Sequence, residues 1–408
     1  MTESASISQA GSILVINGGS SSLKFSLFVV GIPLARTVAG SIDRIGSPQG
    51  MFTWRQEGNS TDERRTIEVP DHRACIAPLL TTIEESLEQH PLRAIGHRVV
   101  HGGRHYQEPQ LIRPVVMEEL QRLSPYDPEH LPAEIALIMG FAERYPHLPQ
   151  VACFDTAFHR EMPAVARLLA IPRRYNAIGV QRYGFHGISY AFLLKELARI
   201  GKPGEVEGRI ILAHLGNGAS MAAVKEGHAV ETTMGFTPAS GLPMSRRSGD
   251  LDPGLFPYLA RTEGMTVEQF HRMIHTESGL LGLSEMSSDM RDLLKHEGSD
   301  PRVAEAVEFF CYQARKGIGA LAAALGGLDT LVFSAGIGEH APLIRARICA
   351  GLEFLGIVIN EPANDANHSV ISTEESRVNV RVIPTDEERE IAESVAPLLT
   401  NANRIAGA

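Results

Sequence analysis

Several features that mark common protein classes are missing from this sequence. It has four cysteines in 408 residues, and none forms a C-x-x-C pair: Cys75, Cys153, Cys311 and Cys349. That spacing argues against a zinc cluster or a disulfide framework and is typical of a reducing compartment. Positive charge is also scarce, because 38 Lys and Arg stand against 48 Asp and Glu, a net charge of −10. Nucleic acids and anionic membranes attract basic faces, so we expect neither as a partner.

Long apolar runs are absent as well. No stretch approaches the roughly 18 uninterrupted apolar residues of a membrane-spanning helix. The segment from Met1 to Gly11 is polar and Ser-rich, without the basic and apolar regions of a signal peptide, and is typical of a frayed tail. The sequence therefore predicts a soluble cytoplasmic protein that binds no membrane.

What is present indicates a globular α/β protein. The 408 residues exceed the size at which one hydrophobic core keeps growing, which favours two domains. A strand at Ser12–Ile16, a Gly-rich turn and a second apolar alternation from Leu23 predict a hairpin. Residues 209–224 repeat this pattern around Gly216–Ser220, which indicates an internal duplication.

A third Gly-rich segment has a different context. Helical spacing over Val303–Leu325 and an apolar run at Thr330–Phe333 lead into a Gly-x-Gly turn at Ser334–Glu339, followed by a helix near Pro342. Such a turn can lay backbone amides against a nucleotide. Near the end, Thr385 with Glu388 fits a capping box that opens the final helix.

The opening turn, Asn17–Lys24, has the composition of a phosphate-binding loop. Its glycines permit close approach of the backbone, its three serines donate hydrogen bonds, and Lys24 adds charge. The Walker A spacing is absent. From these residues alone, an ordinary polar hairpin turn is the alternative.

Motifs along nearly the whole chain make the sequence resemble the acetate and propionate kinase family. They occur in family order: Val15–Lys24, Gly96–Gly103, Phe154–His159, Arg182–Gly187, His214–Ser220, Met234–Pro238, Arg247–Asp250, Ser278–Gly282, Ser287–Asp289, Ala335–Glu339 and Ile383–Thr385. The resemblance implies a duplicated actin-like, ribonuclease H-like ATPase fold of class α/β, with two domains around a cleft. We expect an N-terminal lobe of residues 1–156 with 391–408, and a nucleotide-binding and dimerisation lobe of residues 157–390.

The resemblance also implies the catalytic residues. Arg98 and Arg247 match the two active-site arginines of the family, and His186 matches the histidine that, with Arg247, stabilises the transition state. Taken alone, each would more often be a surface charge or a structural side chain. Arg246 is expected at the surface, and His97, His101 and His159 are expected to organise loops.

Oxygen-bearing side chains are the candidates for a magnesium site, with Mn²⁺ as an alternative ion. Asn17, Asp155 and Glu387 are expected to form it, and Asn17 and Asp155 also count among the catalytic residues. Asp155 closes an apolar run, where an ionised carboxylate needs a cation or a donor. Glu387 opens the last helix, so compensation of the helix dipole is its alternative role.

The remaining candidates are implied by resemblance to bind ATP or ADP and the carboxylate substrate. The ATP candidates are Ser22, Lys24, His214, Leu215, Gly216, Asn217, Gly218, Asp289, Met290, Arg291, Gly336, Ile337, Gly338, Glu339 and His340. A small residue at Gly336 leaves room for a base and ribose, which favours ATP over pyrophosphate. The carboxylate candidates are Arg98, Val100, Tyr126 and Pro238.

The sequence departs from the family pattern in a few places. Ser124–Pro128 is one residue shorter than the family segment, lacks its histidine, and places Tyr126 where an acyl-pocket leucine is expected. Met290, His340 and Asp386 replace an aromatic residue and two asparagines. These changes concern acyl and nucleotide preference rather than phosphoryl transfer.

The expected function is reversible, Mg-dependent transfer of the γ-phosphoryl group of ATP to acetate, by direct in-line attack. One alternative is a kinase of propionate or another short-chain carboxylate. Another is a non-catalytic nucleotide-binding module of the actin and chaperone type. A homodimer is implied by resemblance only.

Overall fold

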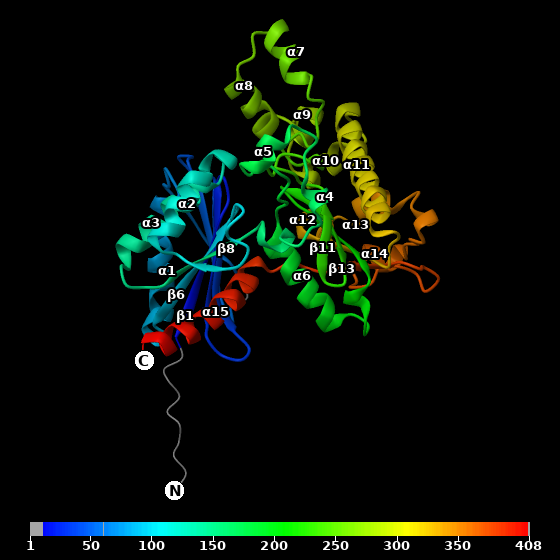
Figure 1. Cartoon of the computed structure of the whole chain (residues 1–408). Coiled ribbons are helices and arrows are strands. Elements are labelled where there is room, and N and C mark those ends of the chain that lie inside the picture. The colour runs from blue at the N-terminus through cyan, green and yellow to red at the C-terminus, as the bar shows by residue number, and fades with distance from the viewer. Residues whose placement is uncertain (1–10, 60, 407–408) are drawn as a thin grey trace. The chain divides into compact units, whose positions relative to one another are not determined.

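The computed structural model describes residues 11–59 and 61–406, so the expected tail at Met1–Gly11 lies almost wholly outside the described residues. The chain divides into two compact units, residues 1–157 with 386–408, and residues 158–385. Each is built around its own mixed sheet (Figure 1). The sequence-based division into two domains, residues 1–156 with 391–408 and residues 157–390, stays a prediction.

The first unit has an eight-stranded sheet in the order β5-β4-β3-β2-β1-β6-β8-β7. Its strands are β1 (Ser12–Gly18), β2 (Ser22–Val29), β3 (Ala35–Asp43), β4 (Gly50–Gln56), β5 (Glu63–Ile67), β6 (Leu92–Val99), β7 (Gln110–Leu111) and β8 (Gln150–Phe154). Its helices are α1 (Ile76–Gln89), α2 (Pro114–Leu123), α3 (Leu131–Arg144) and α15 (Glu387–Ala406).

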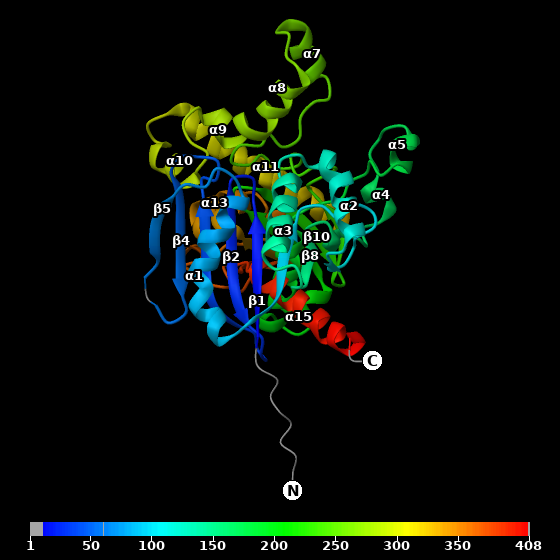
Figure 2. The same cartoon turned by 90° about the vertical axis from the view of Figure 1, so that its left-hand side faces the viewer.

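Helices cover both faces of this sheet (Figure 2). Leu14, Ile16 and Ile95 belong to one core with Leu79 and Ile83 of α1 and Leu137 and Phe141 of α3. The next residue of β6, Gly96, points the other way, where a Cβ would come within 2.9 Å of Ile391 and Val395 on α15. Since successive strand residues face opposite sides, a residue without a side chain at position 96 lets α15 pack directly on the strand.

The second unit has a five-stranded sheet in the order β11-β10-β9-β12-β13. Its strands are β9 (Arg209–Leu215), β10 (Ala219–Lys225), β11 (His228–Thr232), β12 (Thr330–Ser334) and β13 (Asn379–Val382). Its helices are α4 (Ala164–Arg167), α5 (Arg173–Ala177), α6 (Gly187–Ile200), α7 (Leu255–Thr262), α8 (Val267–Arg272), α9 (Gly279–Ser284), α10 (Met290–His296), α11 (Pro301–Leu325), α12 (Ala335–His340), α13 (Pro342–Cys349) and α14 (Glu361–Asp365).

The two sheets repeat one arrangement. In the first, β1 pairs antiparallel with β2 and parallel with β6, which pairs parallel with β8. In the second, β9 pairs antiparallel with β10 and parallel with β12, which pairs parallel with β13. The third strand of each sheet, β3 or β11, adds antiparallel to the hairpin. This confirms the predicted α/β class and the duplication, including both predicted hairpins.

The predicted long helix of the second unit is also confirmed as α11, and its ends follow capping chemistry. The Asp300 side chain accepts from the N–H of Arg302, Pro301 occupies the first turn, and Gly326 ends the helix with φ +72°. Proline suits a helix start because it lacks an N–H, and glycine tolerates the left-handed terminal residue. α11 packs across β9, β10 and β11, while α6 covers the other face through Leu193 and Leu197.

Two local predictions were wrong. The expected Gly-x-Gly turn is the short helix α12, because the Glu339 carboxylate accepts from the N–H of Ala335 at 2.7 Å and closes the segment into a helical turn. The capping box at Thr385 and Glu388 does not form. Asp386 caps α15 instead, through a 3.0 Å bond from the N–H of Arg389 to its carboxylate.

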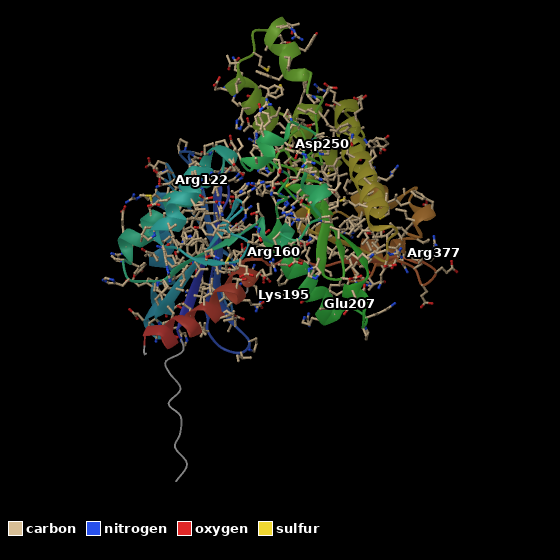
Figure 3. All side chains as sticks on the ribbon, viewed as in Figure 1. Arg122, Arg160, Lys195, Glu207, Asp250 and Arg377 are labelled. Carbon is tan, nitrogen blue, oxygen red and sulfur yellow. The ribbon has the colours of Figure 1, made fainter. Side chains whose placement is uncertain are left out.

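The surface of the chain is rich in charged side chains. Six exposed examples from both units are labelled in Figure 3: Arg122, Arg160, Lys195, Glu207, Asp250 and Arg377. Within residues 11–59 and 61–406, no helix combines the length and apolar character needed to cross a membrane.

Candidate active site

The opening turn of the first unit joins the central strand β1 to β2 and is held by two side chains from elsewhere. The Nη1 group of Arg98 donates to the carbonyl of Gly18 at 3.1 Å, and Nε2 of His72 lies 2.7 Å from the carbonyl of Gly19. A Cβ at Gly18 would lie 3.1 Å from Leu137. The carbonyls of Gly18 and Gly19 are therefore both held by side chains of the first unit. Of the side chains predicted to bind ATP here, Lys24 is exposed and Ser22 half-buried.

A buried ion pair lies at the ends of two neighbouring parallel strands. Arg98 is the penultimate residue of β6, and Asp155 follows β8 directly. Nε and Nη2 of Arg98 donate to the same oxygen, Oδ2 of Asp155, at 3.1 and 2.6 Å. The Asp155 side chain is completely buried, and that of Arg98 is 14% exposed. Carboxyl ends of parallel strands are where open α/β sheets bind ligands, and the sequence motifs alone did not show this pairing.

The other oxygen of Asp155 is the most informative atom of this cluster. Oδ1 is buried and has no hydrogen-bond partner among the described residues. Burial raises the pKa of Asp155, Arg98 opposes that rise, and Glu387 reinforces it. A buried carboxylate oxygen without a donor is costly unless a cation or water approaches it.

The start of α15 adds two more carboxylates. The side-chain nitrogen of Asn17 donates to Glu387 and to Glu388, each at 2.9 Å. Its carbonyl oxygen is thus the atom that remains for a cation or its water. Burial raises the pKa of Glu388, which Lys24 opposes. Of the residues predicted to hold magnesium, Asn17 and Glu387 are therefore in direct contact.

Sequence reasoning missed Glu134. It lies on α3, is 3% exposed, and accepts the N–H of Val100 with both carboxylate oxygens at 3.2 and 3.0 Å. Burial raises its pKa to about 8, although Arg98 and the bond from Val100 act in the other direction. The only signal in the sequence was a charged residue within an apolar helical pattern.

This cluster fits a hydrated magnesium ion better than a closed metal site. Nowhere in the described part of the chain do three or more His, Cys, Asp or Glu side chains form a group that could hold a metal. Magnesium, however, keeps several waters and is usually bound through one or two carboxylates and substrate phosphates. Asp155, Glu387 and Glu388 supply negative charge near Asn17, and Oδ1 of Asp155 lacks a donor.

The acyl-site candidates of the first unit lie beside this cluster. Val100 is 1% exposed and is held by Glu134. Tyr126 ends a short 3₁₀ turn, Ser124–Tyr126, and its ring contacts that of His101 edge-on, with centroids 5.4 Å apart. His101 is fully buried, and burial lowers its pKa to about 4. Tyr126 is therefore packed against a loop-organising histidine and lies next in the chain to the buried Asp127.

The second unit assembles its own group of predicted residues around His186. Nδ1 of His186 lies 2.8 Å from the Ser220 hydroxyl, and its ring stacks on His214 with centroids 4.2 Å apart. Nδ1 of His214 lies 2.8 Å from the Ser189 hydroxyl, which also bonds Thr385. Each imidazole is thus oriented by a serine, and sequence reasoning identified neither serine.

Arg247 lies in the same group. A Cβ at Gly218 would be 3.0 Å from Nε2 of His186 and 3.7 Å from Nη1 of Arg247, so the glycine separates the two side chains. Nη1 of Arg247 also donates to the carbonyl of Pro238 at 3.3 Å. The arrangement presents an imidazole and a guanidinium beside a glycine backbone, which suits an anionic group.

The second Gly-rich turn continues this surface. Leu215 is buried, whereas Gly216 and Gly218 are half-buried and Asn217 is exposed. The hydroxyl and N–H of Ser245 bond to the side-chain and main-chain oxygens of Asn217 at 3.3 and 3.2 Å. These bonds fix the turn against the loop that carries Arg247.

The adenosine candidates differ in exposure. Asp289 caps α10 and pairs with Arg291, which is 85% exposed, whereas Met290 between them is buried. Gly336 faces open space, since a Cβ there would meet no atom within 4 Å.

The neighbours of Gly336 differ in the same way. Ile337 is half-buried, Gly338 buried and His340 exposed. Glu339 has a structural role, because its carboxylate accepts hydrogen bonds from the N–H groups of Ala335 and Thr385 at 2.7 and 3.1 Å.

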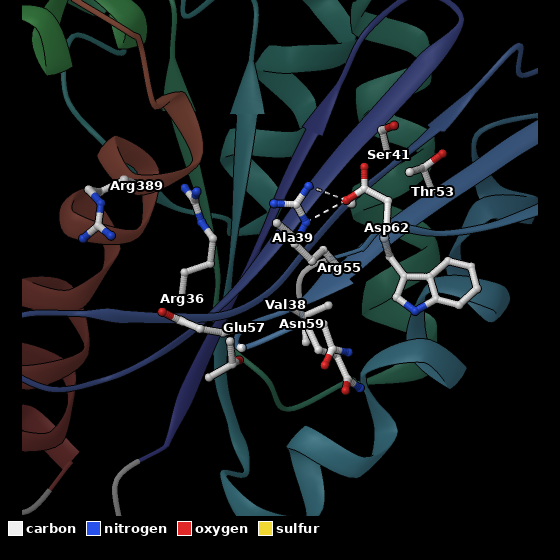
Figure 4. A pocket seen from close by; sticks show the side chains of 15 residues that line it. Arg36, Val38, Ala39, Ser41, Thr53, Arg55, Glu57, Asn59, Asp62 and Arg389 are labelled. Atoms are coloured by element: carbon white, nitrogen blue, oxygen red, sulfur yellow. Dashed lines mark hydrogen bonds and ion pairs between the residues drawn. The ribbon is translucent and has the colours of Figure 1, made fainter.

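A hollow of about 620 Å³ in the first unit contains none of these residues (Figure 4). It lies over β3 and β4, with Arg36 and Arg389 at one end and the Arg55–Asp62 ion pair at the other. Its basic groups are largely neutralised: Arg36 pairs with Asp386, and Arg389 lies 3.5 Å from the same carboxylate. Size alone does not make it the functional site.

Known proteins resemble the whole chain. The acetokinase family matches residues 12–393. The acetate kinase of Methylocella silvestris is 42% identical over 398 residues, covering 95% of this chain and 98% of that protein. A crystal structure of Porphyromonas gingivalis acetate kinase superposes with a TM-score of 0.85 at 35% identity, covering 96% of this chain and all of that one. A propionate kinase from Francisella tularensis reaches 0.87 at 34%, covering 94% and 98%. This chain therefore belongs to the acetokinase family.

Proposed function

We propose that this protein is an acetate kinase, which transfers the γ-phosphoryl group of ATP reversibly to acetate and forms acetyl phosphate and ADP. One observation carries the proposal: the family match runs from residue 12 to residue 393 and so spans every candidate residue from Asn17 to Glu387. The residues also suit the chemistry. In the first unit Arg98 pairs with Asp155, and in the second unit Arg247 lies beside Gly218 and His186.

The chemistry requires positioning and positive charge rather than a base. Acetic acid, with a pKa between about 4 and 5, is already ionised at neutral pH. A carboxylate oxygen attacks the γ-phosphorus in line, and the bond between that phosphorus and the bridging oxygen of ADP breaks. The obstacle is repulsion between two anions, which oriented guanidinium groups reduce.

We assign roles to this chain's residues accordingly. Arg98 binds the carboxylate, and Asp155 fixes its guanidinium through two bonds to one oxygen. Arg247 and His186 stabilise charge on the transferred phosphoryl group. A magnesium ion, when bound near Asn17, Asp155 and Glu387, would neutralise phosphate charge. Val100, Tyr126 and Pro238 contact the acyl group.

Nucleotide binding is assigned to the second unit. The turn His214–Gly218 lies along the phosphates, while Asp289–Arg291 and Gly336–His340 surround adenosine. The open space at Gly336 supports ATP rather than pyrophosphate as the donor. Of these residues, Met290 and Glu339 contribute through backbone or packing, because their side chains are buried or bonded. Cytoplasmic location and a homodimer complete the proposal.

The test is a hydroxamate assay that traps the acyl phosphate. Purified protein is incubated with ATP, Mg²⁺ and acetate, propionate or butyrate, and pyrophosphate replaces ATP in parallel. We expect product from ATP with acetate as the best acceptor. No product above the blank with any carboxylate would favour a nucleotide-binding module without chemistry. Light scattering of the same sample tests the homodimer.

Propionate is the second candidate acceptor, since a solved propionate kinase matches this chain as well as the acetate kinase does. One methylene in an apolar pocket changes binding by only about 1–3 kcal/mol, so the ratio of kcat/KM values decides. A higher kcat/KM on propionate than on acetate would reassign the substrate.

A further inference from the structure

His159 lies beneath the loop that carries His186 and does not belong to either group described above. Its side chain is 1% exposed. Nε2 lies 3.0 Å from the carbonyl of Phe185, whereas Nδ1 has no hydrogen-bond partner in the described part of the chain. A carbonyl only accepts, so Nε2 carries the proton and Nδ1 is the bare nitrogen. The one N–H group of the His159 ring therefore donates to Phe185, the residue before His186.

The loop fits closely around this ring. Gly184 has φ +76°, and a Cβ there would come within 2.6–2.7 Å of the imidazole. Only glycine permits this approach and this backbone conformation together. Two residues later His186 itself has φ +57°, which is left-handed. A non-glycine residue in that region is strained and persists only where its surroundings enforce the conformation.

A second path connects the same ring to the His186 side chain. The rings of His159 and Tyr190 meet edge to face, with centroids 5.8 Å apart at 81°. The Tyr190 hydroxyl lies 2.5 Å from that of Ser220, which lies 2.8 Å from Nδ1 of His186. His159 therefore holds the His186 backbone through Phe185 and packs against the residue that fixes its imidazole.

We propose that His159 is a positioning residue for phosphoryl transfer, which keeps His186 in its left-handed conformation with Nε2 presented beside Gly218 and Arg247. This inference rests on the proposed function of His186. The positioning role that we propose for His159 involves no proton transfer. Burial lowers the pKa of His159 to about 4, so its imidazole stays neutral at physiological pH and serves as a fixed donor.

The test compares two substitutions of similar bulk. His159→Phe fills the space but removes the donor to the Phe185 carbonyl, whereas His159→Gln keeps an N–H that can reach that carbonyl. We expect His159→Phe to lower kcat at least about 10-fold while the KM values for ATP and acetate change less than about 3-fold. His159→Gln should retain most of kcat. Equal activity of His159→Phe and the parent would overturn the proposal.

A double-mutant cycle separates positioning from general damage. If His159 acts through His186, adding His159→Phe to His186→Ala causes no further loss of kcat. Multiplicative losses would show that His159 acts independently and would contradict the proposal. Should His159→Phe fail to fold, Tyr190→Phe removes only the hydroxyl of the second path, and we expect a loss of about 3- to 10-fold that also disappears in His186→Ala.

An experiment without catalysis keeps this inference distinct from the proposed function. In spectra of the ¹⁵N-histidine-labelled protein, the His186 ring signals should move in His159→Phe and stay near the parent positions in His159→Gln. Unmoved signals in His159→Phe would sink the inference even if the parent is fully active. An inactive parent with the expected shifts would instead sink the proposed function alone.

Discussion

Arg246 and Arg247 are neighbours in the sequence that the fold places differently. Arg246 is exposed, as the sequence predicted, whereas Arg247 lies against Gly218 and Pro238. We expect Arg247→Ala to lower kcat at least about 100-fold, because a loss of about 2.7 kcal/mol is typical when one transition-state donor is removed. Arg246→Ala is the matched control and should stay within about 2-fold. Comparable rates for the two variants would remove Arg247 from the mechanism.

The proposed role of Glu387 in binding magnesium can be tested by replacing one of its carboxylate oxygens with an amide nitrogen. Glu387→Gln keeps an acceptor for Asn17 but removes one negative charge from the cluster. We expect the Mg²⁺ concentration for half-maximal activity to rise about 10- to 100-fold, the usual effect of altering a ligand's support. Titration of Mg²⁺ at saturating ATP and acetate measures it. The exposed Glu374→Gln is the control, and an identical Mg²⁺ requirement in Glu387→Gln would argue against its role.

At the scale of the element, a substitution in α12 can test where adenosine binds without disturbing the fold. No atom lies within 4 Å of a Cβ at Gly336, so Gly336→Gln should fold normally. If adenosine lies there, the new side chain occupies its space, and we expect the KM for ATP to rise about 10-fold or more while the KM for acetate is unchanged. Gly319→Gln, on α11 with equally open surroundings, should leave both KM values unchanged. An unaltered KM for ATP in Gly336→Gln would move the adenosine site elsewhere.

Short sequence patterns predicted the strands and hairpins better than they predicted the hydrogen bonds of polar side chains. Alternation and glycines located the hairpins at Ser12–Val29 and Arg209–Lys225, because strand pattern and turn chemistry lie within a few residues. The helical turn at Ala335–His340 was missed, since it depends on a bond that Glu339 makes to the segment's own start. Helix capping by Asp386 in place of Thr385 was also missed, since the Thr385 hydroxyl bonds the distant Ser189 and the N–H of Arg389 donates to Asp386.

The candidate residues were found largely through resemblance, and the structure adds the side chains that hold them. Glu134, Ser189 and Ser220 lie on elements distant in sequence from the groups they bond. No spacing rule predicts such contacts, because they arise only when the sheet brings separate strands and helices together. The motifs therefore name candidate residues, whereas the side chains that hold those residues in place are seen only in the folded structure.

At the scale of the whole molecule, three buried histidines predict acid lability. Burial lowers the pKa values of His97, His101 and His159 from 6.5 to about 4. Between pH 6.5 and pH 4, these histidines are protonated in the unfolded chain but neutral in the folded chain. Their contribution to the free energy of unfolding therefore decreases as the pH falls from 6.5 to 4. Each histidine contributes up to about 3 kcal/mol.

Thermal unfolding midpoints measured from pH 7 to pH 4 test this expectation. His97→Gln should flatten the decline, because it removes one of the groups that take up a proton on unfolding, and the exposed His147→Gln should leave the decline unchanged. Glu134 acts in the opposite direction: its pKa is raised from 4.5 to about 8, so its own contribution destabilises the fold as the pH rises through that interval. Burial also raises the pKa values of Asp155 and Glu388, which therefore act in the same direction as Glu134. A midpoint that is constant between pH 6.5 and 4 would contradict the prediction.

The return of α15 to the first sheet has a consequence for biosynthesis. Ile391 and Val395 of this helix cover Gly96, and its first residue, Glu387, contacts Asn17. A ribosome making about 5–20 residues per second completes the entire second unit before it reaches that helix. Until then, the face of the nascent N-terminal sheet that α15 covers is open to chaperones, and the carboxylates of Glu387 and Glu388 reach Asn17 only after the second unit has been synthesised.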